Sequence, residues 1–418
     1  MQHVPNDFLW GASTASHQIE GNTHNQWSAW EKANAGRLAR TASARLSRLS
    51  NFKQIEPAAT DPANYISGSG VDHYNRYEED FAILKQLNMN AFRFGIEWSR
   101  IEPTPGEWDQ AAIEHYRVYI TELKRLNIEP ILTLWHWTAP VWFADKGGFA
   151  KKANIQYFER YVTKIAELFG KDLKYVITLN EPNVYTAFSY LTGEWPPERT
   201  RPYMALRVYR NLVRAHNRAY DTLKAANPAV RVGIAAQLAD MRATNNNSIV
   251  NRVVISAREY FWNWWFIDKI RAHQDFVGLN YYFTEYVNWH GKLQNPSRPI
   301  SDVGWYMEPR GIGRILQRTW KRYQKPIIIT ENGLADSKDT QRKWWLEQTL
   351  LGMEDALGNG VQLAGYLHWS LLDNFEWAYG WWPQFGLVTV DRTTMHRTIR
   401  PSSKWLAETI AQYSSRPS

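Results

Sequence analysis

The sequence predicts an α/β protein built as a single (β/α)8 barrel. Eight short apolar runs alternate with eight longer amphipathic runs, and no linker or change of composition divides the 418 residues. Several apolar runs end on a carboxylate, amide or aromatic side chain, which is where barrels of parallel strands carry their functional groups. A doubly wound open sheet is the competing architecture, but no GxGxxG motif follows the first run. We therefore expect residues 1–418 to form one catalytic domain.

The apolar runs have the length and the β-branched or aromatic content of buried parallel strands. Turn residues such as Gly, Pro and Asn bound many of them. The expected strands are, in order, Phe8–Thr14, Ala91–Trp98, Glu129–Trp137, Tyr175–Glu181, Val230–Gln237, Phe276–Phe283, Pro326–Glu331 and Val361–Leu371.

The intervening runs place apolar residues three and four positions apart, as one face of a helix requires. Tyr74, Tyr77, Phe81 and Leu84 show this spacing in the first run. The expected helices are Asp72–Leu87, Gln110–Leu126, Ile155–Phe169, Tyr203–Ala226, Ile249–Ile270, Ile312–Tyr323, Thr340–Leu357 and Lys404–Tyr413.

Composition excludes several classes of function. The sequence has no cysteine, which excludes disulfides and thiolate chemistry and fits a cytoplasmic location. No apolar run reaches the roughly 18–20 residues of a membrane span, and the N-terminus lacks the pattern of a signal peptide. The formal net charge is +8, with a cluster between Arg37 and Lys53. We interpret that cluster as the solvated face of an Arg-rich loop over residues 36–50 rather than as a nucleic-acid surface.

Two carboxylates end two similar strands. The run PIIITENG ends its strand on Glu331, and YVITLNEP ends its strand on Glu181. One such glutamate is as often a solvated strand-end residue as a functional one. Two at the same end of a barrel are what the nucleophile and the general acid of sugar-bond cleavage require.

Other candidates lie at strand ends or in the loops that follow them. Arg93 interrupts an apolar strand, and an unpaired buried charge costs several kcal/mol, so we expect a carboxylate partner. His136, taken alone, is more often a satisfied core histidine than a ligand contact, and tryptophans at these positions often only pack. The remaining candidates are Gln18, Trp137, Asn180, Asn280, Tyr282, Trp369, Glu376 and Trp377.

Six stretches together resemble glycoside hydrolase family 1, the β-glucosidase and β-galactosidase family. They occur in the family's order and span about residues 5–410. Each is weak evidence alone, but six in order are specific. The matching stretches are FLWGASTASHQIEG (Phe8–Gly21), FRFGIEWSRIEP (Phe92–Pro103), TLNEP (Thr178–Pro182), DFVGLNYYF (Asp275–Phe283), ITENG (Ile329–Gly333) and HWSLLDNFEW (His368–Trp377).

The resemblance implies a retaining β-glycosidase that acts on terminal β-D-glycosides through a covalent glycosyl-enzyme. Glu181 would be the acid/base and Glu331 the nucleophile, with their carboxyls roughly 5–5.5 Å apart. Arg93 and Tyr282 would hold the nucleophile. The resemblance implies a small-molecule glycoside partner and no metal or organic cofactor. The sugar contacts that it implies are Gln18, His136, Trp137, Asn180, Asn280, Trp369, Glu376 and Trp377.

The chain also departs from the family. Only 38 residues separate Gln237 from Phe276, where the family has a longer excursion, so the leaving-group side of the pocket is expected to be more open. The phospho-sugar branch carries phosphate ligands where this chain has Trp377, Pro383 and Phe385, which disfavours 6-phosphoglycosides. Transglycosylation and non-catalytic sugar binding remain the alternatives to hydrolysis. A nucleic-acid binder finds no support in the strand-end motifs.

Overall fold

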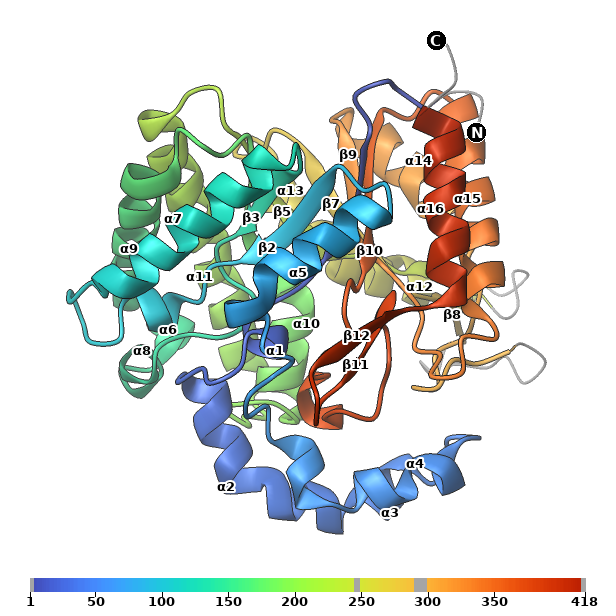
Figure 1. The fold of residues 1–418 in the computed structure, drawn as a ribbon, viewed down its shortest axis with the longest axis horizontal. Helices are drawn as coiled ribbons and strands as arrows, with labels where there is room; N and C mark the ends of the chain where they lie inside the picture. The colour runs from blue at the N-terminus through green and yellow to red at the C-terminus, as the bar shows by residue number, and fades with distance from the viewer. Residues whose placement is uncertain (1–3, 244–248, 289–298, 415–418) are drawn as a thin grey trace.

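The computed structural model describes residues 4–243, 249–288 and 299–414. Eight parallel strands close into a barrel in the order β1-β10-β9-β7-β5-β4-β3-β2, with helices around it (Figure 1). The prediction of a (β/α)8 barrel is confirmed. The barrel strands are β1 (Leu9–Ser13), β2 (Ala91–Gly95), β3 (Glu129–Thr133), β4 (Tyr175–Asn180), β5 (Arg231–Gln237), β7 (Val277–Tyr281), β9 (Ile327–Asn332) and β10 (Leu363–Trp369).

All eight strands were predicted, but several end earlier than expected. Residues 96–98 and 134–137 lie beyond the ends of β2 and β3, so His136 and Trp137 belong to a loop rather than to a strand. The apolar run continues past the last ladder bond because these loops are themselves buried. The length of an apolar run therefore overestimates the length of a strand whose C-terminal end contributes to a site.

The predicted helices cover the barrel. One prediction was wrong in detail, since Ile249–Ile270 is not one helix but two, separated by a π-helical turn at Tyr260–Trp264. The covering helices are α5 (His73–Gln86), α7 (Gln110–Arg125), α9 (Ile155–Phe169), α11 (Pro202–Ala226), α12 (Ile249–Glu259), α13 (Trp265–Lys269), α14 (Gly311–Tyr323), α15 (Arg342–Gly358) and α16 (Pro401–Ser414).

The remaining elements lie in the loops between strands and helices. Two small sheets pair β6 with β8 and β11 with β12. These elements are α1 (Ser16–Ile19), α6 (Trp98–Ile101), α8 (Val141–Asp145), α10 (Pro182–Ala187), β6 (Asp240–Ala243), β8 (Thr284–Val287), β11 (Val388–Asp391), β12 (His396–Ile399), the π-helical turn Phe188–Thr192 and the 3-10 turns Pro62–Tyr65, Gly148–Ala150, Lys152–Asn154 and Trp377–Tyr379.

Apolar side chains fill the interior of the barrel at the N-terminal end of its strands. They come from strands all around the ring and form one buried cluster, so this half of the barrel is packed rather than hollow. Polar side chains take over toward the C-terminal ends, where Arg93 and Asn180 are fully buried. The cluster contains Leu9, Ala91, Ile131, Tyr175, Ile177, Ala235, Phe276, Ile328 and Leu367.

The predicted Arg-rich loop at residues 36–50 is wrong, because most of it is helical. The chain forms α2 (Gln26–Arg40), α3 (Ala42–Leu46) and α4 (Phe52–Ala59), here called the α2–α4 segment. Its Arg, Ala and Leu residues favour helix. Leu38, Ala42, Leu46 and Leu49 recur at helical spacing and are buried, which the charge pattern concealed.

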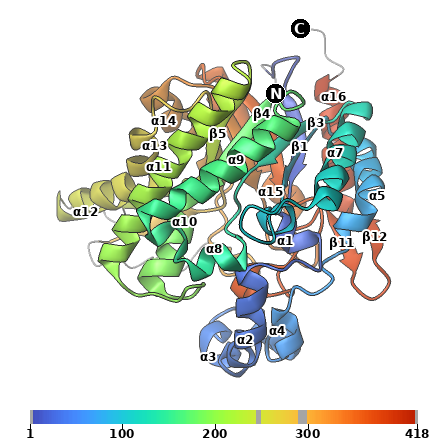
Figure 2. The ribbon, with the colours of Figure 1, turned by 90° about the vertical axis from the view of Figure 1, so that its left-hand side faces the viewer.

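The α2–α4 segment covers the functional end of the barrel. In Figures 1 and 2 it lies below the barrel, whereas both chain ends lie at the top. Leu46 and Leu49 pack in one cluster with Tyr282, Trp369 and Phe385, which lie at or after the C-terminal ends of barrel strands. The segment is therefore a wall of the region in which the candidate residues gather.

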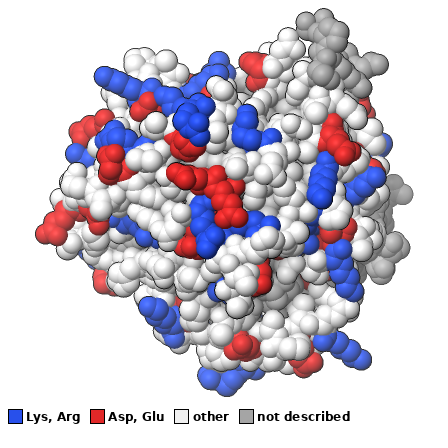
Figure 3. All heavy atoms as spheres, viewed as in Figure 1, with Lys and Arg blue, Asp and Glu red and all other residues white. Residues whose placement is uncertain are grey.

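Positive and negative side chains are interspersed on the face shown in Figure 3. Ion pairs at the surface of the protein include Lys124 with Asp172 and Arg322 with Asp268. Within the described ranges, every helix is too short or too polar to cross a membrane.

Candidate active site

Asn180 points into the barrel because β4 is irregular just before it. Ile177 belongs to the interior cluster, but Thr178 hydrogen-bonds a histidine of α11 and Leu179 packs with helix residues. Two outward residues in succession break the alternation of a strand, and the pairing with β5 shifts between Ile177 and Asn180. Such an irregularity re-aims the next side chain. Asn180 turns inward, and Glu181 follows at the lip.

A second irregularity aims Glu331. Ile328 belongs to the interior cluster and Thr330 donates to an asparagine inside the barrel, so Glu331 should point outward. Instead Glu331 also faces the interior, where it meets Arg93. Asn332 points outward and accepts a hydrogen bond from an indole of α15. The pairing of β9 with β7 shifts at this level. Both predicted catalytic glutamates thus depend on breaks in strand alternation.

Glu331 is held by a cation and a hydroxyl. Arg93 Nη1 donates to Glu331 Oε1 at 2.5 Å, and the Tyr282 hydroxyl donates to Glu331 Oε2 at 2.6 Å. Arg93 is fully buried, so its charge requires a carboxylate partner such as Glu331. Burial raises the pKa of Glu331, and Arg93 and Tyr282 oppose that increase. The predicted pairing of Arg93 with a strand-end carboxylate is present.

Glu181 has a different environment. It adopts a left-handed backbone conformation (φ 43°) directly before Pro182, which begins α10. Such strained positions gather at functional sites. Asn280 Nδ2 donates to Glu181 Oε1 at 2.8 Å, and no cation forms an ion pair with it in the described part of the chain. Burial, then the negative charge of Glu331, raises the pKa of Glu181 well above its usual value. The neutral acid is favoured at this position.

Asn180 connects three neighbours. Its Oδ1 accepts hydrogen bonds from Arg93 Nη2 at 2.7 Å and from Asn280 Nδ2 at 3.3 Å. Two donors on one atom fix the orientation of the amide, so Nδ2 faces His136 Nε2 at 2.9 Å. Burial and the charge of Arg93 lower the pKa of His136 well below its usual value. His136 is therefore neutral, accepts at Nε2 and carries its proton on Nδ1.

Several buried polar atoms at this site lack protein partners in the part of the chain that the structure describes, among them one of His136 and one of Gln18. Among the described residues, none hydrogen-bonds His136 Nδ1 or Gln18 Oε1. The first is a donor and the second is an acceptor. Leaving such groups unsatisfied costs about 1–3 kcal/mol each, so a ligand with hydroxyl groups would recover that cost. His136 is thus more than the satisfied core histidine that its sequence context alone would suggest.

Glu376 shares hydrogen bonds with Gln18 and Asn374. Gln18 Nε2 donates to Glu376 Oε2 at 3.4 Å, and Asn374 Nδ2 donates to the same oxygen at 2.9 Å. Burial raises the pKa of Glu376 to about 7. The carboxyl lines a cavity, so it remains available to a ligand.

Three tryptophans surround the His136 ring. Its centroid lies 5.7 Å from the ring of Trp369 and 5.9 Å from that of Trp377, to which it is stacked. Trp137 lies 4.8 Å from Trp377, and its Nε1 donates to the backbone oxygen of Asn180 at 2.8 Å. Flat apolar faces beside orphaned polar atoms match the alternating apolar and hydroxyl surfaces of a sugar.

A cavity of about 250 Å³ brings most of these residues together. Predicted residues that line it are His136, Trp137, Glu181, Tyr282, Glu331, Trp369, Glu376 and Trp377. Gln18, Arg93, Asn180 and Asn280 lie behind this lining and hold it through the bonds described above.

Sequence reasoning missed the outer part of the cavity. Arg45 of α3 lines it, as does Trp262, which stands in the aromatic stretch of the shortened region. Aromatics away from the strand ends carry no strand-end signal, and the helix of Arg45 was not expected. The other lining residues that were missed are Val184, Phe188, Glu194, Trp195, Gln237, Phe283, Glu285, Trp305, Ala378, Tyr379 and Phe385.

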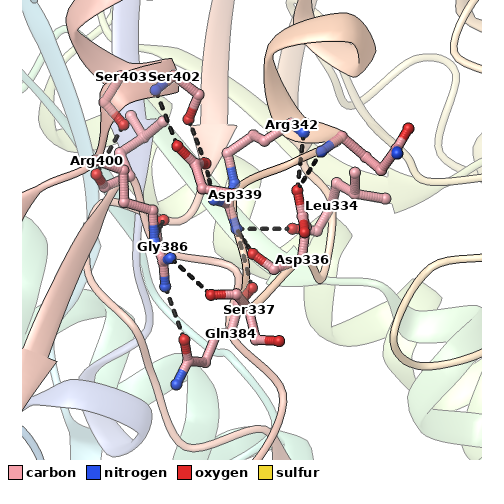
Figure 4. Close-up of polar contacts among 12 residues, drawn as sticks. Leu334, Asp336, Ser337, Asp339, Arg342, Gln384, Gly386, Arg400, Ser402 and Ser403 are labelled. Carbon is pink, nitrogen blue, oxygen red and sulfur yellow. Dashed lines mark hydrogen bonds and ion pairs between the residues drawn. The ribbon is translucent and has the colours of Figure 1, made fainter. Parts of the chain in front are cut away.

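Two buried arginines, Arg342 and Arg400, brace the loops that follow β9 and β10 (Figure 4). Arg342 pairs with Asp339 and donates from Nη2 to the backbone oxygens of Leu334 and Gln384, at 3.3 and 3.1 Å. Arg400 Nη2 donates to Gln384 Oε1 at 2.9 Å. These bonds hold two loops together. One follows β9, the strand that contains Glu331, and the other follows β10 and itself contains Glu376.

Comparisons with known proteins agree with this geometry. The family model described as glycosyl hydrolase family 1 matches residues 1–270 and 266–414. The chain is 32% identical to "Beta-glucosidase A" of Thermotoga maritima, with 98% of each chain covered. It is also 32% identical to "1,4-beta-D-glucan glucohydrolase" of Thermotoga neapolitana, again over 98% of each.

Solved structures give the same result. A β-glycosidase from Pyrococcus horikoshii matches with a TM-score of 0.85 at 32% identity, covering 99% of this chain and 98% of that one. The Thermotoga maritima β-glucosidase in complex with glucoimidazole matches with a TM-score of 0.85 at 28% identity, covering 98% and 99%. The resemblance seen in the six sequence stretches is confirmed: the chain belongs to glycosyl hydrolase family 1 and is a glycoside hydrolase.

Proposed function

We propose that this glycoside hydrolase is a retaining β-glycosidase that removes terminal β-D-glycosyl units. The observation that carries the proposal is the contrast between two neighbouring carboxylates. Glu331 faces the cation of Arg93 and the hydroxyl of Tyr282, whereas Glu181 is buried with only an amide donor. One environment favours the carboxylate and the other favours the acid, as the two roles at a glycosidic bond require.

The proposed reaction has two displacements. Glu331 attacks the anomeric carbon while Glu181 donates its proton to the leaving oxygen, which gives a glycosyl ester and the free leaving group. Glu181, now ionised, takes a proton from water as that water attacks the anomeric carbon and releases Glu331. One water is consumed and the anomeric configuration is retained.

We place the sugar against the inner wall of the cavity. Trp369 would stack on one sugar face, and Glu376 would accept from its hydroxyl groups. His136 Nδ1 and Gln18 Oε1 would gain the partners that they lack. Asn180 would contact the 2-hydroxyl, with Trp137, Asn280 and Trp377 completing the pocket.

β-Glucosides are the proposed first substrates, with β-galactosides and β-fucosides also accepted. Two relatives at 32% identity are named for glucosidase or glucohydrolase activity, which supports this order. The chain is proposed to act as one catalytic domain, and its cytoplasmic location stays a prediction.

Transglycosylation is the second candidate. The rings of Phe188, Trp195 and Trp262 line the outer cavity and offer a surface for a sugar acceptor in place of water. A relative at 28% identity, covering 96% of this chain and 72% of its own, is named as a galactolipid galactosyltransferase from Arabidopsis thaliana. Non-catalytic binding is disfavoured because both glutamates are present.

A panel of aryl β-glycosides tests the proposal. Wild type and Glu331→Gln are compared on the glucoside, galactoside, fucoside, mannoside, xyloside and 6-phosphoglucoside, with and without an added alcohol acceptor. We expect hydrolysis by wild type, loss of activity in Glu331→Gln and little turnover of the 6-phosphoglucoside. Folded wild type that cleaves none of them would contradict the proposal.

A further inference from the structure

Arg45 occupies an unusual place for a surface arginine. It lies on α3 of the α2–α4 segment, is only partly exposed and lines the same cavity as Glu181 and Glu331. It is the one Lys or Arg in the lining of this cavity, within the part of the chain that the structure describes. A cation at this position can contact a ligand that binds in the cavity.

The guanidinium is held in place by neutral acceptors. Its Nη2 donates to the backbone oxygen of Leu38 at 3.0 Å and to the Tyr65 hydroxyl at 3.2 Å, and its Nε donates to Thr41 Oγ1 at 3.3 Å. Tyr65 is fully buried and donates onward to the backbone of Ala59 at 2.8 Å. The arginine is thus oriented before any ligand arrives, which lowers the entropy cost of using it.

The charge of Arg45 has no carboxylate partner. Across residues 4–243, 249–288 and 299–414, no carboxylate oxygen lies within 4.0 Å of it, and its Nη1 has no acceptor. Arg37 in the same segment, by contrast, pairs with Glu198. A partly desolvated guanidinium without a counter-ion favours an anionic ligand, most of all a carboxylate that it can bind through two nitrogens.

Besides Glu181, Glu331 and Glu376, two glutamates line the cavity, and neither pairs with Arg45. Glu285 accepts from Arg258 Nη2 at 3.0 Å. Glu194 is exposed to solvent, which screens its charge. Burial and the charge of Glu194 raise the pKa of Tyr379, which also lines the cavity, and the charges of Arg48 and Arg45 oppose that increase.

The rest of the outer cavity is aromatic. Phe188, Trp195, Trp262, Phe283 and Trp305 line it. In the proposed binding mode the sugar lies beside Glu331, and the leaving group would extend toward these rings and Arg45. Flat apolar walls favour a flat leaving group, and the cation favours a carboxylate on it.

We propose that Arg45 binds a carboxylate on an aromatic leaving group, so that β-glycosides of hydroxylated aromatic acids are preferred substrates. This inference rests on the proposed function and adds the class of leaving group. The chemistry is unchanged: Glu181 protonates the phenolic oxygen as its bond to the sugar breaks, and the hydroxy acid departs.

The test compares two substrates of nearly the same shape that differ in the charge of one group. These are the 4-carboxyphenyl and 4-carbamoylphenyl β-glycosides of the sugar that wild type cleaves best. The two phenols differ in acidity, which affects their rates in every variant. The measured quantity is therefore the ratio of kcat/KM for the carboxyphenyl glycoside to that for the carbamoylphenyl glycoside. The effect of acidity cancels when this ratio is compared between variants. The variants are Arg45→Met, Arg45→Lys and the control Arg40→Met, which removes an exposed charge from the same segment outside the cavity.

We expect Arg45→Met to lower kcat/KM for the carboxyphenyl glycoside about five- to tenfold, mainly through KM, since a charge-assisted pair is lost. The carbamoylphenyl glycoside should change less than about twofold, and Arg45→Lys should restore part of the difference. The wild-type preference should shrink between about 0.05 and 0.5 M salt, because screening weakens a partly exposed pair. Arg40→Met should behave as wild type.

Equal effects of Arg45→Met on both substrates would overturn the inference, as would a salt-independent wild-type preference or an equal effect of Arg40→Met. In those cases the carbamoylphenyl glycoside is still hydrolysed and the proposed function stands. If wild type cleaves neither of these substrates and none of the aryl glycosides in the panel, the proposed function and this inference are both overturned. The wild-type ratio and its salt dependence remain informative even if Arg45→Met fails to fold.

Discussion

Replacing Arg93 by Met should lower kcat/KM strongly. A matched control variant should lose a similar amount of stability and keep most of its activity. Arg93 is fully buried, and its four hydrogen bonds reach Glu331, Asn180, Thr133 and the backbone of Thr330 at 2.5–3.1 Å. Methionine fills much of the space but leaves a buried carboxylate without its cation.

The magnitude follows from that contact. Removing one partner of a buried ion pair costs about 3–5 kcal/mol. If the same interaction keeps Glu331 ionised for attack, kcat/KM should fall about 100- to several-thousand-fold. The sign of the pH effect is also fixed. Burial raises the pKa of Glu331 and Arg93 opposes it, so the variant should raise that pKa further and move the acid limb of kcat/KM to higher pH.

The assay measures kcat/KM for an aryl β-glucoside across about pH 5–8, together with the free energy of unfolding in urea. Arg397→Met is the control, because Arg397 Nε pairs with Asp80 at 3.0 Å and is equally buried, outside the cavity. The control should lose comparable stability and keep its pH profile. An Arg93→Met variant with activity within tenfold of the control and an unshifted acid limb would refute the reasoning.

Three further predictions concern the same site. Because burial raises the pKa of Glu376 to about 7, KM for glycosides should rise as pH falls through that value, and Glu376→Gln should abolish this dependence; a wild-type KM that is flat from about pH 5 to 8 would contradict the role of this carboxylate. Tyr282→Phe removes the 2.6 Å hydrogen bond to Glu331, so kcat/KM should fall about tenfold or more and its acid limb should move to higher pH, and an unchanged pH profile would argue against that bond. Arg342→Met removes the buried ion pair with Asp339 and the hydrogen bonds to three backbone oxygens, so the free energy of unfolding should fall by about 3–5 kcal/mol in urea titrations, whereas a loss under about 1 kcal/mol would show that the contacts in Figure 4 do not brace these loops.

The barrel could be predicted because its determinants are local. Each strand is a run of apolar residues buried on both faces, and each covering helix repeats its apolar residues at helical spacing. The order of the strands then follows from right-handed connections between neighbours. Glu181 and Glu331 were found because each ends such a strand.

The aim of the two glutamates was not predictable. Simple alternation directs Glu331 out of the barrel, since Thr330 already points inward. The irregularities in β4 and β9 that reverse this arise from tertiary contacts with neighbouring strands. Sequence identified the residues, and only the packed barrel shows why they face one cavity.

The α2–α4 segment was misread for a related reason. Its charges suggested a solvated loop, but Leu38, Ala42, Leu46 and Leu49 form a buried stripe among the arginines. Long basic side chains hide such a stripe from a count of charges, because their stems cover apolar surface while their ends reach water. Arg45 was therefore not recognised as part of the cavity.

Glu331 is the proposed nucleophile, which becomes covalently attached to the sugar during the reaction. The most direct test incubates the protein with a 2-deoxy-2-fluoro-β-glucosyl fluoride, which slows hydrolysis of the ester more than its formation, and measures intact mass followed by peptide sequencing. We predict stoichiometric addition of one fluoroglucosyl group, carried by Glu331 in the peptide that contains ITENG. Attachment at another residue, or complete turnover of natural substrate by Glu331→Gln, would contradict the account.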